Sequence, residues 1–113
     1  MTYLLAIAAP ALYFWLFWSV YVLVMGIYRA HLSGRMSRVT LALALPWVAL
    51  GYAMDVLANM TLAVAGFMDR PQELLVTARL KRYMAGPDGW RKTVATWMCA
   101  HLLDIFDPSG RHC

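Results

Sequence analysis

Two long apolar runs, separated by a short polar segment, constrain this chain more than any other feature. Residues 2–28 contain no charged side chain, and residues 39–68 contain only Asp55. Each run exceeds the roughly 20 residues that cross a bilayer core of about 30 Å. A soluble domain of 113 residues could not bury two such helices. The sequence therefore predicts an all-α integral membrane protein. Residues 1–68 would form an antiparallel two-helix transmembrane hairpin, with helices at about 2–28 and 39–68.

Composition and charge agree with a membrane class. The chain is 62% hydrophobic and 14% charged, whereas an average soluble domain is about 45–50% apolar and about 25% charged. All ten Lys and Arg residues lie outside the two apolar runs, and the net charge is +4. In a membrane protein such charges set orientation and contact lipid, so we expect a bilayer partner rather than nucleic acid. The expected location is the bacterial inner membrane, as a multi-pass protein.

The orientation of the hairpin stays open. The connecting segment, residues 29–38, holds three arginines and no acid, which by the positive-inside rule favours a cytoplasmic link. Four cations follow the second run closely and favour the opposite arrangement: Arg70, Arg79, Lys81 and Arg82.

The C-terminal region, residues 69–113, is predicted to form two amphipathic helices. Asp69 is a good N-cap with Pro71 in the first turn, and the segment from Gly86 to Gly89 is a turn signal. Basic and aromatic side chains alternate on these helices, as on helices that bind lipid or a protein partner. We expect this membrane or partner surface to consist of Arg79, Lys81, Arg82, Trp90, Arg91, Lys92 and Trp97.

A polar stripe interrupts the second apolar run. Tyr52, Asp55 and Asn59 recur at i, i+3 and i+7, so they share one helix face. A charge at mid-bilayer costs at least about 2.5–3.5 kcal/mol. One interpretation is a stripe for oligomer contacts or proton movement. The other is that the helix ends early and Asp55 caps a second short helix at the interface.

The C-terminal tail gathers residues that suit either a disulfide or a metal ion. The candidates are Cys99, His101, Asp104, His112 and Cys113. A turn at 107–110 would return the tail along the preceding helix, so Cys113 could meet Cys99, or His112 could join His101 and Asp104. Zinc is the metal to consider, but the usual C-x2-C spacing is missing. No catalytic motif is present, and we expect neither a cofactor nor an enzyme.

Four segments of the second half resemble a group of small, uncharacterised phage and prophage proteins. These segments are DVLAN (55–59), PQELLVTARLKR (71–82), GW (89–90) and the ending LLDIFDPSGRHC. The group shares a T/S-A-R core and an H-C ending, whereas the aromatic first helix is a departure from it. The resemblance covers about half the chain. It implies a phage origin and a role at the host envelope, and it assigns no catalytic residue.

Taken together, these patterns predict a non-enzymatic phage-type small membrane protein. It would act by protein and lipid contacts at the host inner membrane, with itself or with another membrane or phage protein. Two alternatives remain. One is a holin-like lysis protein, which small size and two spans favour. The other is a metal-binding sensor or enzyme built on the Cys/His/Asp tail.

Overall fold

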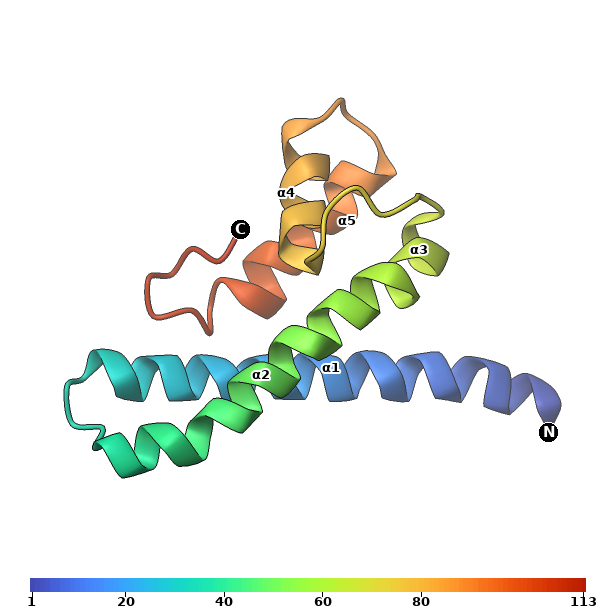
Figure 1. The fold of residues 1–113 in the computed structure, drawn as a ribbon. Helices are drawn as coiled ribbons and strands as arrows, with labels where there is room; N and C mark the ends of the chain where they lie inside the picture. Colours follow the sequence, from blue (N-terminus) through green and yellow to red (C-terminus); the bar gives the residue numbers. More distant parts are fainter.

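The computed structural model describes all 113 residues, and its regular elements are all helices with no strand, as the sequence predicted (Figure 1). The elements in chain order are α1 (Thr2–Leu32), α2 (Arg38–Met60), α3 (Leu62–Phe67), α4 (Val76–Ala85), α5 (Trp90–Met98) and a π-helical turn (Cys99–Leu103) that continues α5.

The first two helices form an antiparallel pair, joined by a short link with Gly34 at φ 74°. Ser37 caps α2, because its hydroxyl accepts the backbone N–H of Thr40 at 3.1 Å. The helices lie in close contact at Gly51, where an added Cβ would lie 2.7 Å from Val24 Cγ2. By length and composition, two segments are long and apolar enough to cross a membrane: Thr2–Leu32, which is α1, and Arg38–Phe67, which includes α2 and α3.

The second apolar run does not form one helix to residue 68. It breaks at Thr61 (φ −121°, ψ −79°), whose hydroxyl donates to the Leu57 carbonyl at 2.7 Å, and α3 follows as a separate short helix. Met68 ends α3 in the left-handed region, at φ 51°. The first helix, in contrast, runs four residues further than the predicted end at Tyr28.

The helix predicted to begin at Asp69 begins instead at Val76. Residues 69–75 run as an irregular segment across the end of α2 and α3 (Figure 1). Asp69 caps no helix, since its carboxylate accepts hydrogen bonds from Arg82 and Tyr83 on α4. Long-range contacts therefore override the local capping signal.

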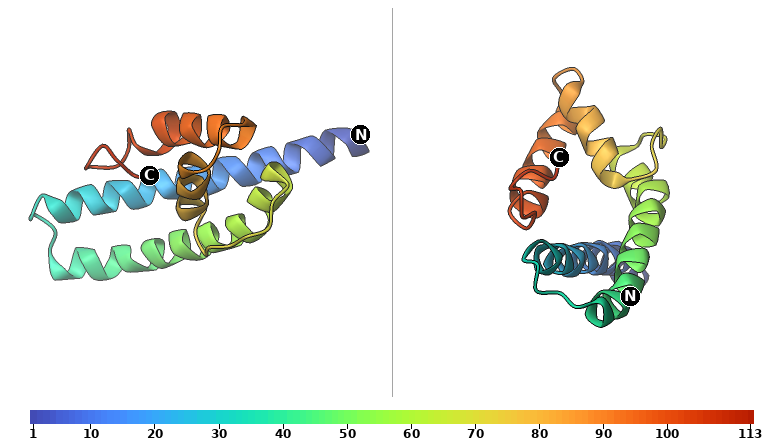
Figure 2. Two further views of the ribbon diagram at one scale, coloured as in Figure 1. Left: turned by 90° about the horizontal axis from the view of Figure 1, so that it is seen from above. Right: turned by 60° about the vertical axis from the view of Figure 1, so that its left-hand side comes forward.

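The core lies between α4, α5 with its π-helical turn, and the C-terminal end of α2 with α3. It does not lie between the two long helices. α1 buries no residue, and α2 buries only Ala58 and Asn59. Figure 2 shows α4, α5 and the tail gathered on one side of the hairpin, with α5 and the π-helical turn running over α1. The buried apolar residues are Ala58, Ala63, Phe67, Val76, Leu80, Tyr83, Ala95, Cys99 and Leu103.

Candidate functional site

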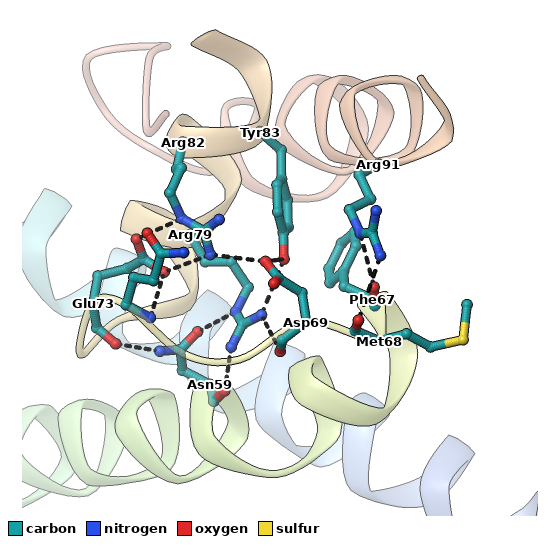
Figure 3. A network of polar contacts seen from close by, with 10 residues as sticks. Asn59, Phe67, Met68, Asp69, Glu73, Arg79, Arg82, Tyr83 and Arg91 are labelled. Atoms are coloured by element: carbon teal, nitrogen blue, oxygen red, sulfur yellow. Dashed lines mark hydrogen bonds and ion pairs between the residues drawn. The ribbon is translucent and has the colours of Figure 1, made fainter. Parts of the chain in front are cut away.

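A buried arginine organises the junction between α2 and α4 (Figure 3). Arg79 is fully buried, and its Nε donates to Asn59 Oδ1 at 2.6 Å while Nη2 donates to the Asn59 carbonyl at 2.9 Å. Its Nη1 donates to the Asp69 carbonyl at 3.1 Å and to the Tyr83 hydroxyl at 3.0 Å. Asn59 in turn donates to the Glu73 carbonyl at 2.5 Å. The guanidinium has no direct carboxylate partner, so neutral acceptors supply the hydrogen bonds that its burial requires.

Two carboxylates and Arg82 form an ion-pair layer over this buried arginine. Arg82 lies 3.1 Å from Asp69 Oδ2 and 3.0 Å from Glu73 Oε2. The Tyr83 hydroxyl bond, followed by Arg82, holds the pKa of Asp69 below its ordinary value. Burial works to raise the pKa of Glu73, but hydrogen bonds from Arg82 and from the Gln72 N–H outweigh it and lower that pKa. Both acids are therefore ionised at neutral pH and bind Arg82.

Asp55, in the polar stripe of α2, caps the first turn of α4. Asp55 Oδ1 accepts the backbone N–H of Val76, the first residue of α4, at 2.8 Å. Helix N-termini leave such N–H groups without an intrahelical partner, so a side chain from another helix caps α4 here. Asp55 does cap a helix, as one interpretation expected, but α2 continues past Asp55 to Met60 and the helix that it caps is α4. Tyr52 is exposed and takes no part in this contact.

A disulfide closes the tail. Cys99 and Cys113 are bonded, with Cα atoms 5.9 Å apart. Asp104 stabilises the return of the chain, since its Oδ1 accepts the N–H groups of His112 at 2.7 Å and Cys113 at 3.1 Å. His112 then lies between two side chains, 2.9 Å from Thr77 Oγ1 and 3.0 Å from Asp107 Oδ2.

The structure does not assemble the predicted metal set. No three His, Cys, Asp or Glu side chains are placed to hold an ion. His101 stacks on Trp97 at a centroid distance of 4.9 Å and bonds the Trp97 carbonyl, on an exposed face apart from His112. Both thiols are consumed by the disulfide. The metal interpretation of these five residues is therefore not supported by their positions.

Aromatic residues in the middle of α1 attach the tail to the first long helix. The indole N–H of Trp18 donates to the Leu102 carbonyl at 2.9 Å, and the Tyr21 hydroxyl donates to the Leu103 carbonyl at 2.6 Å. Both carbonyls belong to the last residues of the π-helical turn, and that of Leu103 also accepts the backbone N–H groups of Phe106 and Asp107. Arg29 makes a third bond, to the Phe106 carbonyl at 3.2 Å. The mid-helix aromatics thus bind a segment that is 82–84 residues distant in sequence.

The predicted surface set divides into two parts. Arg79 is wrong as a surface residue, because it is buried. Arg82 is engaged by Asp69 and Glu73, and Arg91 donates to the Phe67 carbonyl at 2.9 Å while lying over Trp90. Lys81, Trp90, Lys92 and Trp97 do face outward, with Trp97 54% exposed.

Two apolar cavities lie between the long helices and the C-terminal unit. One, of about 200 Å³, is bounded mostly by α1 and α2 and has Asp55, Thr77 and His112 among its lining residues. The other, of about 400 Å³, lies between α1, α3 and α5. They share Phe14, Phe17, Val76 and Met98 as common walls.

Sequence reasoning missed several polar partners. It did not connect Asn59 with Arg79, or Thr77 with His112 and Asp107, because these pairs are 20 and 35 residues apart and no local spacing links them. The one available signal was chemical: a buried amide near an apolar helix end requires partners, and arginine supplies up to five donors. Comparison of the chain with protein-family profiles, curated proteins and solved structures gives no match.

Proposed function

We propose that this chain is a small phage-type protein of the bacterial inner membrane, anchored by α1 and α2. Its C-terminal unit, residues 69–113, would act through contacts with lipid and with a second copy or another membrane or phage protein. The supporting observation is the apolar surface of the two long helices, of which only two residues are buried. Monomeric soluble proteins rarely expose apolar patches larger than a few hundred Å². In a lipid bilayer these apolar side chains contact hydrocarbon instead of water, so their exposure no longer destabilises the protein.

The disulfide supports an orientation for this proposal. Structural disulfides persist in oxidising compartments and are rare in the cytosol. A closed Cys99–Cys113 bond therefore favours a C-terminal unit on the outer face of the inner membrane. Arg29, in the last turn of α1 beside the link, donates to the Phe106 carbonyl of that unit, so in this orientation the link lies on the same side as the tail, against the positive-inside rule.

The contact surface in this proposal is the outward-facing group Lys81, Trp90, Lys92 and Trp97. Basic side chains beside exposed tryptophans suit a membrane interface or a partner helix. Lys92 pairs only with the exposed Asp88, and such surface pairs contribute about 0–1 kcal/mol, so its ammonium remains available to a partner.

Charge reversal tests the proposal in the full-length protein. The double variant Lys81→Glu/Lys92→Glu should stay in carbonate-washed membranes but lose co-purification of a differently tagged second copy or another envelope protein. The matched control is Arg70→Glu/Arg111→Glu, which makes the same charge change at exposed residues outside α4 and α5. Unchanged co-purification in the first variant would contradict the contact surface. Release of the wild-type protein by carbonate would contradict the anchor.

A holin-like activity predicts a different outcome in the same cells. A holin collapses the membrane potential abruptly on expression alone. The C-terminal unit is folded and closed by a disulfide instead of ending in a free charged segment, which favours the contact role. We expect the membrane potential to persist after induction, and abrupt depolarisation would favour the lysis interpretation.

A further inference from the structure

Three side chains from two distant segments form a hydrogen-bonded relay at the wall of an apolar cavity. Thr77 Oγ1 lies 2.9 Å from His112 Nε2, and His112 Nδ1 lies 3.0 Å from Asp107 Oδ2. With the imidazole neutral and protonated on Nδ1, His112 donates to Asp107 and accepts the hydroxyl proton of Thr77. Hydroxyl, imidazole and carboxylate in this order match the nucleophile, base and orienting acid of acyl-transfer enzymes.

The hydrogen bonds of Asp107 allow it to orient the imidazole of His112. Its Oδ1 accepts the Ser109 hydroxyl at 2.6 Å and the Ser109 N–H at 2.9 Å, which leaves Oδ2 for His112. Burial acts to raise the pKa of Asp107, but the Ser109 and His112 hydrogen bonds outweigh it and lower that pKa. An ionised Asp107 favours the tautomer with its proton on Nδ1, and this leaves Nε2 free to accept a proton.

The position of Thr77 on α4 also supplies backbone N–H groups that could bind an oxyanion, as an acyl-transfer site requires. Thr77 is the second residue of the helix, where N–H groups have no intrahelical acceptor. Val76 donates to Asp55, but the N–H groups of Thr77 and Ala78 make no hydrogen bond within the protein. The N–H of the residue after a nucleophile is the donor that oxyanion holes commonly use.

The cavities indicate the class of substrate. Thr77 and His112 line the cavity of about 200 Å³, most of whose other walls are apolar. It adjoins the cavity of about 400 Å³ through shared walls, and eleven of the thirteen residues around that second space are hydrophobic. Apolar pockets with a few convergent polar groups are typical of small-molecule sites. A hydrocarbon chain fits this lining better than a polar substrate does.

We propose that Thr77 and His112, positioned by Asp107, form a site for hydrolysis of acyl esters that carry a hydrocarbon chain. Thr77 Oγ1 bonds to the acyl carbon while its proton passes to His112 Nε2. The bond from the acyl carbon to the alcohol oxygen then breaks, and the departing alcohol takes that proton. Water, losing a proton to His112, attacks the acyl-threonine, and Thr77 regains the proton as the fatty acid leaves. This activity goes beyond the contact role proposed above.

A covalent probe tests the site in the purified full-length protein with its disulfide intact. An alkyl fluorophosphonate should add once, with loss of fluoride, and peptide mapping should place the adduct on Thr77. Thr77→Val, which removes the hydroxyl at similar size, and His112→Gln should each lower labelling about 100-fold or more. Thr77→Ser should keep it. No adduct on the wild-type protein, or an adduct that persists in Thr77→Val, would overturn the proposal.

Two further measurements separate chemistry from folding. Helix content and the mass change on reduction show whether each variant keeps its fold and disulfide, and p-nitrophenyl esters of long and short acids report turnover. Faster release from the long-chain ester supports the cavity assignment, and equal rates contradict it. Asp107→Glu should restore part of the rate that Asp107→Asn loses. Co-purification of a second copy should be unchanged in Thr77→Val, so failure here is distinguishable from failure of the contact role.

Discussion

At the scale of single residues, Arg79 and Asn59 are the most demanding pair in the molecule. Both are fully buried, and each supplies hydrogen bonds that the other requires. A buried charge that loses its partner is left uncompensated, whereas replacing the whole polar group by apolar residues is often nearly neutral.

Asn59→Leu should therefore lower the free energy of unfolding by about 3 kcal/mol, because Arg79 keeps its charge but loses the Oδ1 acceptor. The double variant Asn59→Leu/Arg79→Met should be more stable than Asn59→Leu alone. Thermal melting in detergent, followed by circular dichroism, measures both. A double variant that is less stable than the single one would show that Arg79 contributes beyond its bonds to Asn59.

The ion-pair layer of Asp69, Glu73 and Arg82 predicts how stability depends on pH. Both acids have folded-state pKa values below their ordinary values of 3.8 and 4.5. A lowered carboxyl pKa stabilises the folded state fully above the unfolded pKa, and this contribution disappears as the pH falls through the folded pKa. Melting temperature should therefore fall as the pH decreases below about 4.5. Glu73→Gln should flatten that dependence, and an unchanged slope would exclude Glu73 as a contributor.

At the scale of helices, α4 depends on a cap from α2. Asp55→Ala removes the acceptor for the Val76 N–H, and loss of an N-cap typically costs about 1 kcal/mol. Asn retains an acceptor, so Asp55→Asn should retain most of the stability. Hydrogen exchange at the first turn of α4 measures the effect, with α1 as an internal control. Equal protection in the Ala and wild-type proteins would contradict the capping role.

The helices also show what the sequence could and could not predict. The two long apolar helices and the turn before Trp90 follow from local patterns, and all are present. The break at Thr61 and the late start of α4 do not, because they depend on Asp69, Arg82 and Tyr83 meeting across the fold. The disulfide was one of several interpretations of the tail, and the relay through His112 was not foreseen at all.

At the scale of the whole molecule, the stability of the fold depends on the compartment, because the disulfide forms only where conditions are oxidising. The disulfide closes a loop with a sequence separation of 14, and loops of about 15 residues are stabilised by about 3 kcal/mol. In intact cells, an impermeant thiol reagent should label Cys113 only after reduction, since Cys99 is buried. Labelling that requires cell lysis instead would place the tail inside and contradict the proposed orientation.

The two bonds from one face of α2 also have a mechanical consequence. Asp55 and Asn59 lie about one helical turn apart and bind residues 73–76 and Arg79, so α2 can neither slide nor rotate against the C-terminal unit without breaking them. α2 and the C-terminal unit therefore move as one rigid body. α1 lacks any buried residue and touches α2 closely at Gly51, which makes that crossing a pivot. A force on the C-terminal unit would reach the link between α1 and α2 as a swing of α2 about this pivot, restrained by the hydrogen bonds from Trp18 and Tyr21.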